Sequence, residues 1–264
     1  MEEVWRNETL KHLSKPKTKA FEVLNEQESF EAIFKDASKV VRSKSTKTIH
    51  DSVFPKTPSD LKGLQLSRKS LSDSSLTILA SKLEQKHDFK ALFLAKNNFS
   101  EIGIQVLANT LKKDTSIRHL ILSRNAITDY AVAALADMLK VNRYIGWLVL
   151  NGNDIGDRGA MDISSALREN DGVIHVILSD NHIGDDGVVS LAEAFKQNTN
   201  AISLFIAGNP IGNRGLIALI DLLKNTQTLK ILDIRNIKNL DKTLLNQLSK
   251  IADEKGIRLL SNKQ

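Results

Sequence analysis

The sequence predicts an α/β solenoid made of short strand-turn-helix units stacked in a single array. A pattern of the form Leu-x-x-Leu-x-Leu-x-x-Asn recurs with a constant step, equal to the interval from Leu64 to Leu92. Its fourth positions are Leu64, Leu92, Leu120, Leu148, Val176, Leu204, Leu232 and Leu260. Within a unit the spacing of apolar residues changes from two, which suits a strand, to three and four, which suits a helix. A fixed period of this length is the signature of a repeat architecture.

Each unit is expected to begin with a strand and to end with a helix. The first positions of the units are Leu61, Phe89, Ile117, Ile145, Val173, Ala201, Leu229 and Ile257. In the third unit the apolar helical residues share one face, and they are Val132, Leu135, Ala136 and Leu139. We therefore assign residues 61–264 to one repeat domain.

An asparagine marks the end of the strand in five successive units. These ninth-position residues are Asn97, Asn125, Asn153, Asn181 and Asn209. Because an amide side chain both donates and accepts, we expect a stacked column that satisfies backbone groups of the turn. Lys69 and Ile237 replace asparagine in the first and seventh units, where end units should be atypical. Asp157 and Asp185 follow glycines and are expected to cap the incoming helix.

The unit Leu120-x-Leu122-x-x-Asn125-x-Ile127, followed by Ala134-Leu135-Ala136-x-x-Leu139, resembles the ribonuclease-inhibitor subclass of leucine-rich repeats. The resemblance covers about residues 61 to 260. It implies a right-handed horseshoe with a parallel sheet on the concave side and helices on the convex side. It also implies binding of a protein partner, although a fold alone does not fix a function.

Residues 1–60 are expected to form a helical cap and a polar linker. Phe30, Ile33, Phe34, Ala37 and Val41 fall on one face of a helix predicted over 26–42. This helix would cover the open edge of the first unit. The alternative is a separate docking helix. The stretch that follows is rich in Ser, Thr and Lys and contains two prolines, which favours a linker.

Composition excludes several classes of protein. The chain has 264 residues, 41% of them hydrophobic, which is enough for a substantial core. It contains no cysteine, so disulfides, zinc-thiolate sites and thiol catalysis are excluded. No apolar stretch is long enough to span a membrane, and the first residues do not resemble a secretory signal. We expect a cytoplasmic location, or the cytosol of a host cell if the chain is a bacterial effector.

The candidate partner-binding site lies on the predicted concave face. In the strands the leucines point inward, so the third and fifth positions should project outward. The fifth positions supply Phe93, Ile121, Val149, Ile177 and Phe205, and the third positions supply His119, Trp147 and His175. A contiguous exposed apolar stripe with a central tryptophan favours partner binding. The alternatives are simple strand preference and coverage by the N-terminal helix.

Basic residues are concentrated in the first three units. The second and eighth positions there are Lys62, Arg68, Lys90, Lys96, Arg118 and Arg124, whereas later units have mostly glycine, isoleucine or aspartate. We expect a basic rim, represented by Arg68, Lys96 and Arg124, that attracts an acidic segment of a partner. A solvated rim without a role is the alternative.

The sequence indicates a binding protein and not an enzyme. It lacks the motifs of P-loop nucleotidases, serine hydrolases and zinc peptidases. We expect no cofactor and no metal, because His119 and His175 are two strands apart with Trp147 between them. Basic residues without interleaved aromatic residues do not favour nucleic acid. We expect a monomer.

Two functional classes are carried forward. Enrichment in Lys, Asn, Ser and Ile resembles effectors that intracellular bacteria deliver into host cells, which favours a scaffold that binds a host protein. The alternative is an enzyme regulator similar to the GTPase-activating proteins of nuclear transport, which share the repeat subclass. Those proteins carry a strongly acidic C-terminal tail, whereas this chain ends in Ser261-Asn262-Lys263-Gln264.

Overall fold

The computed structural model describes residue 33 and residues 62–262. Within this part of the chain eight short strands form one parallel sheet, and a helix follows each of the first seven. The strands are β1 (Gly63–Gln65), β2 (Ala91–Phe93), β3 (His119–Ile121), β4 (Trp147–Val149), β5 (His175–Ile177), β6 (Ser203–Phe205), β7 (Ile231–Asp233) and β8 (Arg258–Leu260). The helices are α3 (Asp73–Leu83), α4 (Glu101–Leu111), α5 (Asp129–Leu139), α6 (Asp157–Glu169), α7 (Asp185–Gln197), α8 (Asn213–Asn225) and α9 (Lys242–Lys255).

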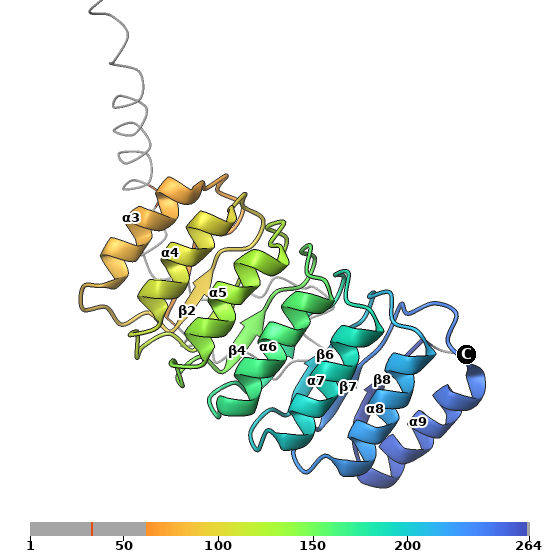
Figure 1. Ribbon diagram of the computed structural model, residues 1–264. Coiled ribbons are helices and arrows are strands. Elements are labelled where there is room, and N and C mark those ends of the chain that lie inside the picture. Colours follow the sequence, from red (N-terminus) through yellow and green to blue (C-terminus); the bar gives the residue numbers. More distant parts are fainter. Residues whose placement is uncertain (1–32, 34–61, 263–264) are drawn as a thin grey trace, which may run out of the picture.

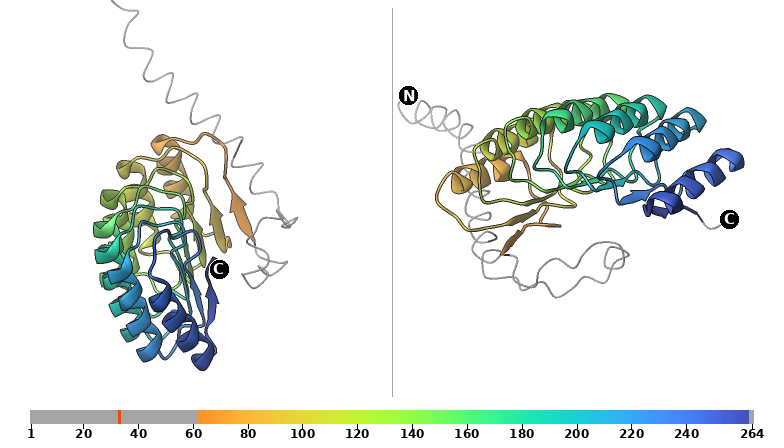
Figure 2. Two further views of the ribbon diagram at one scale, coloured as in Figure 1. Left: turned by 90° about the vertical axis from the view of Figure 1, so that its right-hand side faces the viewer. Right: turned by 90° about the horizontal axis from the view of Figure 1, so that it is seen from below.

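The units stack in chain order. Neighbours in sequence are neighbours in the sheet, and α3 to α9 lie side by side (Figure 1). The helices cover one face of the sheet and form the outer layer of an open, curved array (Figure 2). From β1 to β7 each residue pairs with its counterpart one full repeat later, as Leu64 does with Leu92. The predicted α/β solenoid with a parallel sheet is confirmed.

The main core lies between the sheet and the helices. Leu120 of β3 and Leu122, just after this strand, are fully buried and belong to one cluster with Leu135 and Leu139 of α5. Burial of each such side chain contributes roughly 1.5 to 3 kcal/mol. Of the predicted helix over 26–42, only Ile33 is described; it is helical and packs against this core. The rest of that helix and the polar linker lie outside the described residues.

The last strand departs from the constant step. Leu259, and not Leu260, pairs with Leu232, because β8 begins one position earlier than the constant step requires. The seventh unit ends in Gly256, whose φ of 66° closes α9 in the left-handed conformation. The expectation that Leu260 fills the fourth position is therefore wrong. Leu259 packs on the core side and Leu260 on the other face of the sheet.

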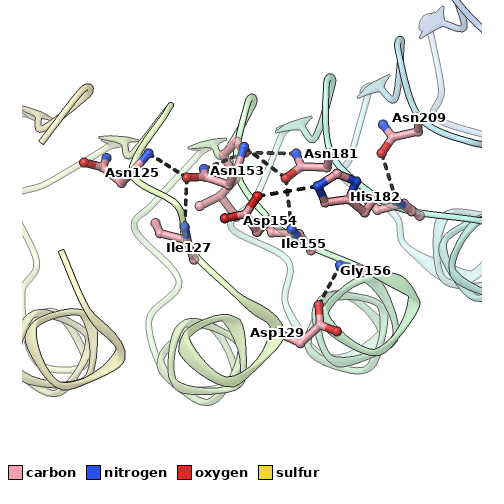
Figure 3. A network of polar contacts seen from close by, with 12 residues as sticks. Asn125, Ile127, Asp129, Asn153, Asp154, Ile155, Gly156, Asn181, His182 and Asn209 are labelled. Atoms are coloured by element: carbon pink, nitrogen blue, oxygen red, sulfur yellow. Dashed lines mark hydrogen bonds and ion pairs between the residues drawn. The ribbon is translucent and has the colours of Figure 1, made fainter. Parts of the chain in front are cut away.

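The asparagine column predicted at the ninth position is confirmed. In three successive links, which run from Asn97 to Asn181, the backbone N–H of one asparagine donates to the Oδ1 of the next. The distance from Asn125 to Asn153 is 2.8 Å (Figure 3). The Nδ2 of Asn153 donates to the carbonyls of Leu122 and Leu150 at 3.1 and 2.8 Å. Each such amide therefore joins its own turn to the preceding unit.

A second asparagine column was missed at the sequence level. The side chains of Asn142, Asn170 and Asn198 follow the helices and are buried. The Nδ2 of Asn170 donates to the carbonyls of Leu139 and Asn142 at 2.6 and 2.8 Å, and its Oδ1 accepts from the N–H of Val173 at 2.8 Å. The two columns thus join neighbouring units at both ends of the strands.

The helix starts carry a third column, and it corrects the expected capping. Gly156 is the N-cap of α6, and it supplies no side-chain cap to this helix. Asp157 instead accepts from the N–H groups of Gly184 and Gly187 at 2.6 and 2.9 Å, so it caps α7 in the next unit. Asp185 does the same for α8. A Cβ on Gly187 would lie 2.8 Å from the Oδ1 of Asp157, so glycine leaves the required space.

This arrangement makes the cap a link between units. Asp157→Ala is expected to lower the free energy of unfolding by about 1 to 2 kcal/mol, because it removes the acceptor for two helix-terminal N–H groups. Asp157→Asn keeps one oxygen and should cost less. Urea denaturation of the full chain measures both changes.

The matched control is Asp137→Ala in α5. Asp137 is exposed and forms an ion pair with Lys140, three residues away along the same helix, so its loss should change stability by less than about 0.5 kcal/mol. An equal effect of the two alanine variants would contradict the role given to Asp157.

Candidate interaction surface on the sheet

The third and fifth positions lie on the face of the sheet opposite the helices. Side chains there form a second apolar cluster, separate from the main core. We name it the sheet-face cluster, and its members are Ile121, Trp147, Val149, Ile177, Phe205, Ile231 and Leu260. The alternation of side chains along the strands therefore places the predicted residues together. Phe93 is next to the cluster, because it pairs with Ile121 on the neighbouring strand.

The exposure expected for this surface is wrong for several of its residues. Val149, Ile177 and Phe205 are only 5%, 3% and 3% exposed, whereas Phe93 and Ile121 are half-buried. Equal positions on neighbouring strands lie about 5 Å apart, and the curvature brings the outer ends of the side chains closer still. Each side chain therefore covers part of the next. The predicted coverage by the N-terminal helix concerns residues outside the described part.

A row of three neighbouring rings, the ring row, includes Trp147 of the sheet-face cluster. The ring centroids of His119 and Trp147 are 5.5 Å apart, and those of Trp147 and His175 are 3.8 Å apart. His175 is buried, and its Nδ1 lies 3.0 Å from the Oγ of Ser203. Burial lowers the pKa of His175 to about 4, with a smaller contribution from His119. Burial also lowers the pKa of His119.

No metal site is formed by the residues that the structure describes. Groups of three or more histidine, aspartate or glutamate side chains suited to an ion are absent from that part. His119 and His175 are separated by the ring of Trp147, as the sequence indicated.

One member of the surface could not be named from the constant step. Leu260 joins the cluster because of the shortened seventh unit. At the same end, buried Asp233 is paired with Arg235, with Nη2 2.7 Å from Oδ2 and Nε 2.9 Å from Oδ1. Residues two apart on a strand share a face, so this pair could have been predicted from the alternation. This satisfied charge pair thus lies between Phe205 and Leu260 in the sheet.

The basic positions fall on two different edges of the sheet. Second-position residues lie before the strands, where Lys62 is 2.5 Å from Asp88 and Arg118 stacks over the ring of Tyr144 at 5.0 Å. Eighth-position residues lie after the strands, where Arg68, Lys96 and Arg124 are exposed. These three residues form the basic rim. The single positive end expected from the sequence is therefore divided between two edges.

The eighth position has an unusual backbone. Its φ is positive in all seven units, at Arg68, Lys96, Arg124, Gly152, Asp180, Gly208 and Asn236. In the sequence, the glycines at two of these positions are the signal for a left-handed conformation. In the basic rim, the pKa of Lys96 is lowered chiefly by the positive charge of Arg68, then by burial and by Arg124.

Among the described residues, no helix is both long enough and apolar enough to cross a membrane.

Comparisons with known proteins agree with the repeat architecture. A family model described as Leucine Rich repeat matches residues 113–136, 142–164 and 173–192. A search of curated protein sequences found no match.

Two solved structures match this chain at low sequence identity. Leiomodin-1 actin-binding site 2 is 20% identical with a TM-score of 0.46, and the match covers 56% of this chain and 88% of that one. A complex of Rad7 and Elc1 in yeast contains a chain that is 18% identical with a TM-score of 0.34, covering 70% of this chain and 59% of that one. Similarity at this level carries no information about function. In the matched repeats, the stacked strand-turn-helix units and the asparagine column, the chain is similar to leucine-rich-repeat proteins.

Proposed function

We propose that this protein is a non-enzymatic scaffold that binds a partner protein on the helix-free face of its sheet. The observation that carries the proposal is the sheet-face cluster, an apolar group outside the main core. Phe93, Ile121 and Trp147 are half-buried, so a partner would remove further apolar area from water. Tryptophan combines a large contact area with one N–H donor, which makes Trp147 the expected anchor.

The partner is proposed to carry an acidic segment. The basic rim lies on the carboxyl edge of the first three strands, beside the end of the sheet-face cluster that contains Ile121. Positive charge at this edge would speed association with an acidic surface and set its orientation. Near the opposite end of the cluster, Arg235 is paired with Asp233.

The setting is proposed from composition. Enrichment in Lys, Asn, Ser and Ile supports an effector that an intracellular bacterium delivers into the cytosol of its host. The bound partner would then be a host protein, and the protein would act as a monomer. Cross-linking in host lysate, followed by mass spectrometry, would supply a candidate partner for quantitative binding measurements.

Trp147→Ala tests the proposed anchor. We expect the variant to bind the purified partner at least tenfold more weakly, a loss of about 1.4 kcal/mol or more, because a central aromatic contact is removed. Trp147→Phe keeps a ring at this position and should retain most of the affinity. Isothermal titration calorimetry measures both, and circular dichroism confirms folding.

The matched control is Tyr130→Ala. Tyr130 is 67% exposed at the start of α5, on the helical side, where Arg158 lies over its ring. Its loss should leave affinity unchanged. If Tyr130→Ala weakened partner binding more than Trp147→Ala did, the binding site would lie on the helical face and the proposal would be overturned.

Burial of His175 in the ring row should also make the free energy of unfolding depend on pH. Because the folded protein holds the pKa of His175 near 4 and the ordinary value is 6.5, the unfolded chain takes up a proton that the folded chain refuses. The stabilising contribution is present above about pH 6.5 and is lost as the pH falls toward 4. We expect a loss of about 2 kcal/mol from this group.

Chemical denaturation between pH 7 and pH 4 measures this dependence. Carboxylates also titrate near the acid end, so the relevant quantity is the difference in unfolding free energy between the wild type and His175→Gln. That difference should shrink as the pH falls. A difference independent of pH would show that His175 does not contribute in the way described.

A further inference from the structure

The basic rim is built on a strained backbone. Two of the seven eighth positions are glycine, which adopts positive φ freely, whereas Arg68, Lys96 and Arg124 hold φ of 59°, 58° and 57°. Side chains other than glycine are disfavoured there because the Cβ approaches the following carbonyl oxygen. Three successive units therefore keep a cation where glycine would be more stable. Strain retained at such positions is a reason to look for a function.

The three basic residues occupy equivalent positions in successive units. They share one backbone conformation on paired neighbouring strands, so their Cα atoms form a row with steps of about 5 Å. The side chain leans toward the next unit, because the Cγ of Arg124 lies 2.8 Å from the place of a Cβ on Gly152. Gly152 thus leaves room for Arg124 and ends the row.

These charges are not neutralised within the described part of the chain. Some basic side chains there have acidic partners, such as Lys62 with Asp88 and Lys196 with Asp221. None of the three residues of the basic rim takes part in an ion pair among the described residues. Arg68 and Arg124 both lower the pKa of Lys96, which indicates mutual repulsion. The basic rim thus combines a left-handed backbone with mutually repelling positive charges.

We propose that Arg68, Lys96 and Arg124 form a binding site for a phosphorylated side chain of the partner protein. That the phosphate belongs to a partner protein rests on the proposed function, whereas the anion site itself does not. A carboxylate would compensate one of three positive charges. A phosphate monoester carries a charge of about −1.5 to −2 at pH 7 and three acceptor oxygens, which matches three cationic donors. Arginine is also well suited to bidentate contacts with phosphate.

The size of the row favours a single phosphoryl group over a nucleic acid. Three cations span only about 10 Å, which is short for a track along a nucleic-acid backbone. Single strands also need aromatic side chains on which bases stack. Tyr130 lies at the start of the helix α5, and Tyr144 lies before β4 beside Arg118, so neither is part of the basic rim.

The test uses the full chain and small probes. Backbone amide resonances are followed by NMR during titration with O-phosphoserine, with inorganic phosphate and with glutamate at pH 7.5. We expect saturable shifts at the three residues and an affinity for phosphoserine at least tenfold above that for glutamate. At pH 5.0 the affinity for phosphoserine should fall at least threefold, because the phosphate loses its second charge near pH 6.

Variants separate binding from folding. Lys96→Gly combined with Arg124→Gly should abolish phosphoserine binding while the Tm stays unchanged or rises, because glycine relieves both strain and repulsion. The control removes two exposed lysines near the C-terminal end, by Lys230→Gln and Lys238→Gln, and should retain full affinity. Equal affinity for glutamate and phosphoserine, or full affinity in the double glycine variant, would overturn the proposal.

Two further outcomes are decisive. Tighter binding of oligothymidylate than of phosphoserine, with the same shifts, would assign the basic rim to nucleic acid and contradict the phosphoprotein proposal. Trp147→Ala should bind phosphoserine normally, since that side chain belongs to the ring row. If phosphoserine does not bind, the anion site is contradicted but partner binding at Trp147 is not. If Trp147→Ala does not weaken partner binding, the proposed function is contradicted but the anion site is not.

Discussion

The structure depends on polar side chains that satisfy backbone groups in the neighbouring unit. A single unit of one strand and one helix cannot bury its apolar face or pair its strand alone. Asn153 joins its own turn to the preceding one, Asn170 does so after the helix, and Asp157 caps the following helix. Because these groups are buried or partly buried, leaving one unpaired costs about 1 to 3 kcal/mol. This penalty holds the period constant from β1 to β7.

Because the period is fixed, residues that vary from one unit to the next lie at equivalent places on the surface. Positions that meet the core or the columns must keep their residue types, whereas the third, fifth and eighth positions are free of those contacts. Along the fifth position the residues are apolar from Phe93 until Asp233, and along the eighth they change from cationic to glycine at Gly152. Each row runs across the strands, so a gradual change along the sequence becomes a boundary on the face of the molecule. The chemical identity of the protein therefore lies in rows and not in single units.

The sequence predicted the sheet, the core and the first asparagine column because each depends on a period that one chain displays repeatedly. It did not predict the second column, since Asp114 and Thr226 interrupt that position at either end. The contacts of Asp157 were misassigned because capping is usually local, and only the stacked structure brings the next helix within reach. The shift at Leu260 follows from one position lost at the turn around Gly256, which a constant step conceals.

The ring row and the basic rim show why burial and charge could not be obtained from position alone. Sequence alternation places Val149 and Ile177 on the outer face, but the curvature of the sheet helps to decide how far neighbours cover them. In the same way, three cations at equivalent positions of successive units predict a positive edge, whereas their common left-handed backbone is a property of the turn that follows each strand. The asparagine column fixes that turn, so the same hydrogen bonds that stack the units also determine where the charges are held. Structure and candidate function are thus linked through one repeated backbone conformation.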